Sequence, residues 1–252
     1  MILELSGVMA GYGSGQVLFG IDLQIEAGQC VSLMGRNGMG KSTTIRTIMG
    51  QLLPTSGMIN RFGVSSITAS PYEIAQSGVG LVPEGRQIFP NLSVRENLTT
   101  FYRPPHAAQK SSWTEQKVLE LFPRLSQRLG NLGSQLSGGE QQMLAIGRAL
   151  MTNPKLLILD EATEGLAPLV RKQIWNSLYS LKESGQSILV VDKNISALAK
   201  LSDHHYILDK GLVAWHGNSL ELLGNPGLKA VSYTHLRAHE TPEHLVCRLL
   251  LE

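Results

Sequence analysis

The sequence has few cysteines and few charged residues, and both shortages limit what the protein can be. Its 252 residues include two cysteines, Cys30 and Cys247, too few for a disulfide framework in a chain this long. Cys30 stands in an apolar stretch, which favours a buried thiol. Charged residues make up 17%, and the net charge of +2 predicts no binding of nucleic acid or an anionic membrane surface through overall charge. The 42% hydrophobic content indicates a globular chain.

Long apolar runs are missing as well. No run approaches the roughly 18 to 20 residues that a membrane span needs, and the first residues lack the basic region and apolar core of a secretion signal. We therefore expect a cytosolic chain that does not itself cross a bilayer. Glycine, in contrast, is abundant, with 26 of 252 residues. The places where these glycines fall carry functional information.

Short apolar runs alternate with helical patterns along most of the chain. Strands are predicted at 2–5, 17–25, 29–34, 58–62, 78–82, 156–159 and 187–191 and near Tyr206 and Val213, and helices from Lys41 and at 112–125, 139–151, 170–183 and 195–201. The unbroken apolar run at 156–159 is typical of a buried strand in a parallel sheet. The alternation predicts an α/β fold with a mainly parallel core sheet, interrupted by a helical insertion at roughly 85–150.

A glycine-rich loop lies between the predicted strand at 29–34 and the helix from Lys41. Gly35 to Ser42 has two glycines, Gly35 and Gly40, with four residues between them, followed by Lys41 and a hydroxyl residue. Backbone N–H groups of such a loop curl around phosphate oxygens, the lysine adds a point charge, and the Ser42 hydroxyl suits Mg²⁺. A plain turn with a surface lysine is the alternative. The context favours a site for a nucleoside triphosphate with Mg²⁺.

Two carboxylates, Asp160 and Glu161, follow the apolar run at 156–159. Ligands of open parallel sheets bind at this end of the strands, although a solvated strand end would look similar. Together with the glycine loop, the two carboxylates are expected to have separate roles: Asp160 orients Mg²⁺, and Glu161 polarises an attacking water as a general base.

A second anion site is predicted at Leu136 to Gln142. Here Ser137, Gly138 and Gly139 open directly into a helix whose apolar side carries Met143, Ile146 and Leu150. A serine and two exposed glycine N–H groups at a helix start suit an anion. One chain seldom needs two phosphate sites for one nucleotide, so the second is expected to serve a nucleotide held by another subunit.

In this order, Gly35 to Ser42, Leu136 to Gln142 and Leu156 to Glu161 resemble the Walker A, signature and Walker B motifs of the ATP-binding cassette (ABC) family. The resemblance covers about residues 1–228. It implies a P-loop ATPase domain at 1–230 with an N-terminal antiparallel β part, a mainly parallel core sheet and a helical subdomain at about 85–150.

The resemblance also implies roles for individual residues. Tyr12 matches the aromatic residue that stacks on adenine, and Glu84 to Leu98 match the switch loop and the segment that faces membrane subunits. The resemblance assigns catalysis to Glu161 and Lys193, and metal binding to Ser42, Glu84 and Asp160. The ATP-binding set is Tyr12, Gly35, Arg36, Asn37, Gly38, Met39, Gly40, Lys41, Ser42, Thr43, Glu84, Ser137, Gly138, Gly139 and Glu140.

Three positions depart from the commonest family pattern. Glu84 stands for the switch-loop glutamine, Ala167 for an aspartate after Walker B, and Lys193 for the switch histidine. Lys193 keeps a positive donor that can reach the terminal phosphate, and the alternative is a surface lysine at a strand end. Together with the sequences at 82–86 and 164–168, these departures resemble the ATPase subunits of importers for branched-chain amino acids and related amides.

That branch implies partners and a location. We expect a homodimer or a heterodimer with a second ATPase subunit, transmembrane permease subunits and, indirectly, a periplasmic solute-binding protein. The chain would lie on the cytoplasmic face of the inner membrane, and no nucleic acid is expected among its partners. Two other classes remain open: a soluble cassette ATPase of translation or DNA repair, which usually has two cassettes or a coiled-coil insertion, and a small P-loop kinase, which leaves 136–142 unexplained.

The last residues do not match the rest. Residues 231–252 hold three of the seven histidines, His235, His239 and His244. A metal site is an alternative, but Pro242 interrupts any helix there and the spacing is not that of two ligands on one helix face. We expect this tail to be foreign to the fold and assign it no site.

Overall fold

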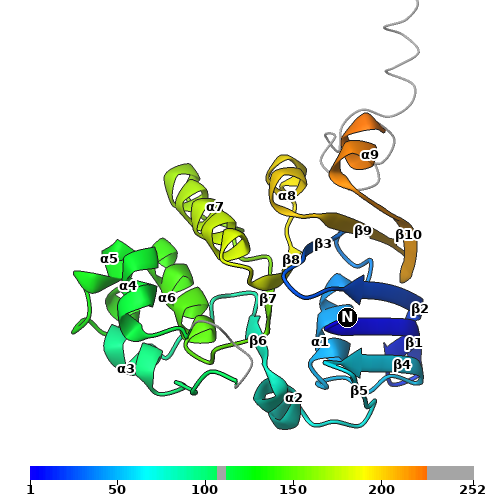
Figure 1. Cartoon of the computed structure of the whole chain (residues 1–252), viewed down its shortest axis with the longest axis horizontal. Helices are drawn as coiled ribbons and strands as arrows, with labels where there is room; N and C mark the ends of the chain where they lie inside the picture. Colours follow the sequence, from blue (N-terminus) through cyan, green and yellow to red (C-terminus); the bar gives the residue numbers. More distant parts are fainter. Residues whose placement is uncertain (107–111, 226–252) are drawn as a thin grey trace, which may run out of the picture.

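A mostly parallel sheet forms the centre of the molecule (Figure 1). The structure, a computed structural model, describes residues 1–106 and 112–225. The sheet has the order β10-β9-β3-β8-β7-β6, and its neighbours are parallel except for the antiparallel pair β9 and β10. Its strands are β3 (Cys30–Met34), β6 (Val79–Val82), β7 (Leu156–Asp160), β8 (Ser187–Val191), β9 (His204–Asp209) and β10 (Leu212–Gly217). The predicted α/β fold is confirmed.

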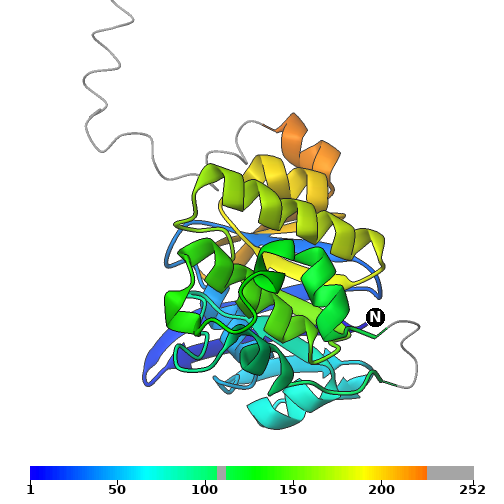
Figure 2. The same ribbon diagram turned by 90° about the vertical axis from the view of Figure 1, so that its left-hand side faces the viewer.

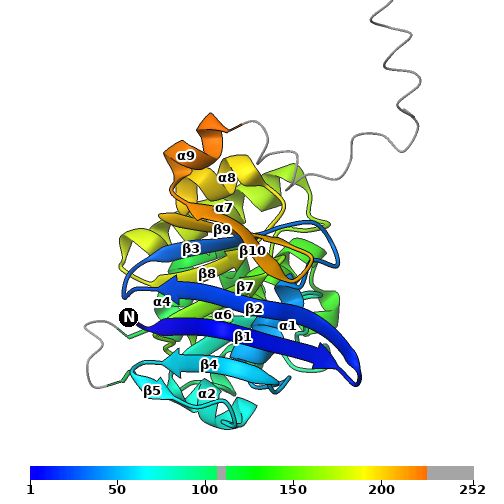
Figure 3. The same ribbon diagram turned by 90° about the vertical axis from the view of Figure 1, so that its right-hand side faces the viewer.

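A second, antiparallel sheet has the order β2-β1-β4-β5 and is seen in front in Figure 3. It consists of β1 (Leu3–Tyr12), β2 (Gly15–Ile25), β4 (Ser56–Arg61) and β5 (Val64–Ser65). The strand predicted at 2–5 was too short. The pairing register with β2 shifts between Leu5 and Val8, where Gly7 has φ 58° and donates to Asp22 Oδ1 at 2.7 Å. This bulge breaks the alternation on which the prediction relied.

Helices cover both faces of the larger sheet. The first, α1 (Lys41–Ile48), follows β3, and α2 (Pro71–Ser77) precedes β6. Later in the chain, α7 (Pro168–Glu183), α8 (Ile195–Leu201) and α9 (Ser219–Gly224) accompany β7 to β10. Within the described residues, no helix is long and apolar enough to span a membrane.

A group of helices lies between β6 and β7 in the chain and faces the viewer in Figure 2. It comprises α3 (Val94–Thr99), α4 (Glu115–Leu121), α5 (Pro123–Ser126), the 3₁₀ turn η1 (Gly133–Gln135) and α6 (Gly138–Leu150). These elements fall in the predicted insertion at 85–150. The proposed domain end at 230 stays a prediction, because residues 231–252 lie outside the described residues.

The apolar core has two parts, one on each face of the larger sheet. Leu157 and Leu159 of β7 face α6 and α7, whereas Leu156 and Ile158 face α1 and the antiparallel sheet, and all four are fully buried. Each such side chain stabilises the fold by roughly 1.5–3 kcal/mol. The unbroken apolar run that predicted β7 therefore reflects burial on both faces. Cys30 is buried as predicted, and burial raises the pKa of its thiol to about 12.

Three short helices were not predicted, namely α2, α3 and α9, and of these α2 and α3 each follow a serine cap. Both begin with a capping box: Ser70 with Glu73 at the start of α2, and Ser93 with Glu96 at the start of α3. In each, the serine hydroxyl accepts from the backbone of the glutamate, whose side chain accepts from the serine N–H. Helices of 7 and 6 residues are too short to show clear periodicity, so the caps were the available signal.

A buried histidine joins β9 to its neighbours. His205 Nδ1 lies 2.6 Å from Ser32 Oγ of β3, and Nε2 lies 2.8 Å from Ser219 Oγ of α9. Its ring is fully buried, and burial lowers its pKa to about 4. The ring therefore stays neutral in the folded protein at pH values where it would be charged in the unfolded chain.

This difference predicts acid sensitivity. In the unfolded chain the ring takes up a proton below about pH 6.5, so the unfolded state binds more protons and the free energy of unfolding should fall from about pH 6.5 toward pH 4. We expect His205 to account for on the order of 2 kcal/mol of this fall. The free energy of unfolding at pH 7.5 and pH 5 is to be compared for wild type, His205→Asn and the exposed control His216→Gln. Equal falls in wild type and His205→Asn would contradict the assignment.

Candidate functional site

The loop between β3 and α1 winds tightly around the start of the helix. Gly40 caps α1 with φ 104°, a left-handed conformation that suits glycine. At Gly35, φ is 139° and a Cβ atom would lie 2.4 Å from the Leu208 carbonyl oxygen of β9. Both positions thus require glycine, and the predicted strand, loop and helix occur in the predicted order.

Lys41 reaches back into this loop. Its Nζ donates to the carbonyl oxygens of Gly35 at 2.9 Å and Arg36 at 3.1 Å and lies 4.0 Å from Glu161 Oε1. The residue is only 5% exposed, and burial lowers its pKa. A buried ammonium group held at the mouth of a glycine loop is suited to a phosphate group.

Asp160 ends β7 beside the start of α1. Ser42 hydrogen-bonds to its carboxylate, yet Oδ1 is buried without a hydrogen-bond partner among residues 1–106 and 112–225. Burial first, and then the charge of Glu84, raises the pKa of Asp160. An unsatisfied buried carboxylate oxygen, a hydroxyl and a second carboxylate are oxygen donors of the kind that Mg²⁺ prefers. Ser42, Asp160 and Glu84 therefore fit the metal that the sequence predicted.

Glu161 is held in an uncommon backbone conformation directly after β7. Its φ is 49°, and its N–H donates to the Val191 carbonyl of β8 at 2.9 Å. A non-glycine residue in this region is strained, and such residues gather at functional sites. Burial, followed by the neighbouring Glu164 carboxyl, raises the pKa of Glu161 to about 7. A carboxyl with this pKa is suited to accept a proton near neutral pH.

Lys193 and Glu164 complete a cluster with Glu161. Lys193 Nζ lies 2.7 Å from Glu164 Oε1 and 3.4 Å from Glu161 Oε2. Hydrogen bonds with Glu161 and then with Lys193 lower the pKa of Glu164, whose carboxylate pairs with Lys193. The turn that presents Lys193 is fixed by Asp192, which accepts from Thr163 at 2.5 Å and from the Asn194 N–H at 2.9 Å.

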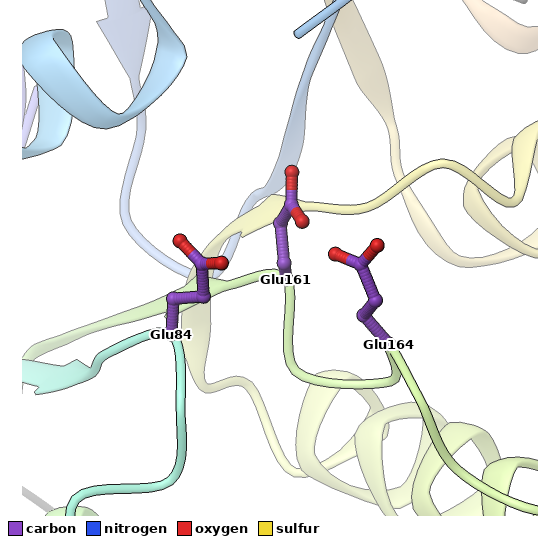
Figure 4. A group of neighbouring side chains, drawn as sticks. All are labelled: Glu84, Glu161 and Glu164. Atoms are coloured by element: carbon purple, nitrogen blue, oxygen red, sulfur yellow. The ribbon is translucent and has the colours of Figure 1, made fainter.

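Figure 4 shows Glu84, Glu161 and Glu164 directing their carboxylates toward one space. Carboxylate oxygens of the three residues lie within 4.8 Å of one another. Glu164 was not among the predicted site residues. No local sequence pattern marks it: the chain turns back three residues after Glu161, with the Glu164 N–H donating to the Glu161 carbonyl at 3.2 Å, and this turn brings Glu164 to the site.

These side chains surround a cleft of about 480 Å³. Its walls gather residues from the glycine loop, the switch segment and the ends of β7 and β8. The lining residues are Val17, Asn37, Gly38, Gly40, Lys41, Ser42, Thr43, Glu84, Glu161, Glu164 and Lys193. Of the other predicted loop residues, Gly35 and Arg36 lie behind Lys41, and Met39 lies against the β9–β10 turn, where its carbonyl accepts from Gly211 at 3.2 Å.

Tyr12 lies at the end of β1, outside the set that lines the cleft. Its side chain is exposed, and its hydroxyl accepts from Arg46 Nη1 of α1 at 3.1 Å. This contact places the ring beside the helix that begins at the glycine loop. Tyr12 belongs to a strand end and not to the loop that its neighbours Gly11 and Gly13 would indicate.

The predicted second anion site lies at the start of α6, away from the cleft. Ser137 caps the helix in a capping box with Glu140, donating its N–H to Glu140 Oε2 at 2.8 Å. The N–H groups of the first turn have no partner within the helix. One detail was wrong: Gly139 is buried, because Val170 of α7 packs so closely that a Cβ atom would lie 2.4 Å from its Cγ1. Met143, Ile146 and Leu150 are buried as predicted.

Comparisons with known proteins agree with this architecture. Residues 18–164 match the model of the ABC transporter family. The high-affinity branched-chain amino acid transport ATP-binding protein BraG of Pseudomonas aeruginosa is 39% identical over 90% of this chain and 97% of its own length. The Nod factor export ATP-binding protein I of Cupriavidus metallidurans is 36% identical over 88% of this chain and 73% of its own length.

A solved structure gives the same picture. The dimeric post-hydrolysis state of the ATP-binding cassette MJ0796 with ADP and phosphate has a TM-score of 0.74 at 25% identity, over 86% of this chain and 99% of that chain. The chain belongs to the ABC transporter family, and it is an ATPase subunit of that family. The names of these two relatives refer to branched-chain amino acid transport and to Nod factor export.

Removal of the Lys41 ammonium should nearly abolish nucleotide binding. In Lys41→Ala the phosphates would lose a buried cation whose partners are otherwise two loop carbonyls and Glu161. Nucleotide affinity by calorimetry is the measurement, with Lys172→Ala, an exposed change on α7, as the control. ATP affinity like that of the control would remove Lys41 from the site.

Lys193 is predicted to act on the terminal phosphate. Lys193→Ala should lower the rate of ATP hydrolysis much more than it lowers ADP affinity, because ADP lacks the phosphate that Lys193 would contact. The two quantities are to be measured on the same preparation. Hydrolysis at the wild-type rate would show that Lys193 only balances the charges of Glu161 and Glu164.

Proposed function

We propose that the protein is the ATP-hydrolysing subunit of an importer for branched-chain amino acids or related amides, and that it acts as a dimer. One observation supports the proposed dimer: the chain has two features suited to phosphate that do not share a cleft. Lys41 and the glycine loop line the cleft, whereas Ser137 and Gly138 start α6 elsewhere. Two subunits facing each other would place the second feature of one over the cleft of the other.

Within such a site, the residues divide the work. The glycine loop and Lys41 bind the phosphates, and Lys193 contacts the terminal one. Ser42, Asp160 and Glu84 would hold Mg²⁺, whose positive charge would offset the charge of the phosphates. Glu161 takes the proton of the attacking water, for which its raised pKa suits it.

The importer assignment rests on residues and on relatives. Glu84, Ala167 and Lys193 together follow the pattern of the branched-chain importer branch, and the similarity to BraG extends over 97% of that protein. The Nod factor export protein is 36% identical but is covered only to 73% of its length. The higher identity and coverage of BraG therefore favour import, with branched-chain amino acids or related amides as the solute class.

A groove between the sheet and the helical group suits a permease. A hollow of about 620 Å³ is lined by Phe89, Phe101 and Tyr102, all exposed, beside Arg148. The rings of Phe89 and Phe101 stack at 5.6 Å, and the Arg148 guanidinium lies 5.1 Å from the Phe89 centroid. Exposed aromatic side chains around a hollow are typical of a docking site. A permease bound here would hold the subunit on the cytoplasmic face of the inner membrane.

Glu161→Gln tests the catalytic site and the dimer together. The amide keeps the size of the side chain but cannot take up the proton, so hydrolysis should slow by roughly 10²–10⁴. ATP should then remain bound and trap a dimer, which light scattering after gel filtration detects. A monomer in ATP with continued hydrolysis would contradict both assignments.

Phe101→Ser tests the groove. Loss of the stacked ring should prevent co-purification with co-expressed ABC permease subunits from the same genome, while the ATPase rate of the isolated subunit stays unchanged. Leu220→Ser, an exposed change on α9, is the matched control. Co-purification equal to the control would place the docking surface elsewhere, and a subunit that recovers no permease in any form would favour a soluble cassette ATPase.

The solute class is tested by transport. Vesicles containing the permease, this subunit and the binding protein should take up leucine or a small amide in an ATP-dependent way. Uptake of neither class, with outward transport of another compound, would favour an exporter.

A further inference from the structure

The segment that follows Glu84 contacts the start of α6 through one side chain, Arg86. A Cβ atom on Gly138 would lie 2.6 Å from Nη1, 2.9 Å from Cζ and 3.0 Å from Nη2 of Arg86. The guanidinium group therefore lies flat against the first residue of α6. These three atoms are the nearest neighbours of that added Cβ atom, so the absence of a side chain at Gly138 makes room for Arg86.

A second arginine ties the same segment to α6 further along. Arg148 Nη2 donates to the Gln87 carbonyl at 2.6 Å. Gly138 and Arg148 are ten residues apart, which is about 15 Å along a helix. The segment is thus attached near both ends of α6, by residues two and three positions after Glu84.

The backbone between Glu84 and these contacts has an uncommon shape. Gly85, Arg86 and Gln87 have φ of 79°, 67° and 43°, all in the left-handed region. Two of the three are not glycine, so their conformation is held by the surrounding contacts. The turn directs Glu84 toward the cleft and Arg86 toward α6 from positions only two residues apart.

The contact between Arg86 and α6 involves no ion pair among the described residues. Within residues 1–106 and 112–225, no carboxylate lies within 4.0 Å of its guanidinium, whereas Arg95 and Arg128 have such partners. The position of Arg86 is therefore set by its packing on Gly138 and not by an ion pair.

We propose that Arg86 is a positioning residue that couples Glu84 in the nucleotide cleft to the Ser137–Gly139 segment at the start of α6. The proposal rests on the dimer of the proposed function. In that dimer, Glu84 responds to the nucleotide and metal of its own subunit, and Ser137 and Gly138 bind the nucleotide of the facing subunit. Arg86 thereby links the state of one ATP site to the phosphate contacts offered to the other.

Dimerisation in the Glu161→Gln background tests this coupling. Arg86→Ala should weaken ATP-dependent dimerisation by about tenfold, within the range of coupling between contacting residues. ATP affinity of the monomer and the melting temperature should stay unchanged, which a merely structural role would not predict. In the otherwise wild-type enzyme, the Hill coefficient for ATP should fall toward one. Arg95→Ala, an exposed arginine of α3, is the control.

A double-mutant cycle separates the contact from other effects. As a single change, Gly138→Ala should weaken dimerisation, because the methyl group displaces the guanidinium. In the Arg86→Ala background it should weaken dimerisation little further. Equal effects of Gly138→Ala in both backgrounds, or Arg86→Ala that dimerises like Arg95→Ala, would overturn the proposal while leaving the dimer intact. Failure of the Glu161→Gln parent itself to dimerise in ATP would overturn the dimer, and this coupling with it.

Discussion

The burial of the Lys41 ammonium group is the constraint around which the site is arranged. A charged lysine that is 5% exposed must be compensated, and here the compensation comes from two carbonyl oxygens of its own loop and from Glu161 at 4.0 Å. The loop can present those carbonyls only because Gly35 and Gly40 adopt conformations suited to glycine. Burial still lowers the pKa of Lys41, so the protein alone stabilises the charge incompletely. A phosphate group would supply the missing compensation.

The parallel sheet brings the remaining groups to the same place. Strands β6, β7 and β8 run parallel, so their carboxyl ends share one edge. Asp160 ends β7 and Glu161 follows it, while Glu84 and Lys193 lie two residues after β6 and β8. Their charges are mutually dependent. Burial and neighbouring carboxylates raise the pKa values of Asp160 and Glu161, while Lys41 lowers both and Lys193 lowers that of Glu161. A cation near Asp160 and Glu84 would relieve their repulsion.

Features that depend on residues close together in the sequence could be predicted, whereas features that depend on contacts made by the fold could not. β7 and the glycine loop were predicted because burial on both faces and left-handed turns restrict the residue types directly. Glu164 and Arg86 have no such pattern, since their importance comes from neighbours that the fold brings together. The extension of β1 was missed because the bulge at Gly7 interrupts alternation, and α2 and α3 because their signal lies only in the caps. The burial of Gly139 depended on the approach of Val170 from α7, which no local pattern records.

If each ATP site is built from two subunits, two variants that are each inactive should complement each other in a mixed dimer. Lys41→Ala removes the cation of the cleft, and Ser137→Asp retains a good helix cap while placing a carboxylate where the partner's phosphate would approach. In a mixed dimer, one composite site keeps both intact parts. We therefore expect that mixing the two variants restores ATP hydrolysis, which neither variant shows alone. A mixture as inactive as its components, with mixed dimers shown to form, would contradict it.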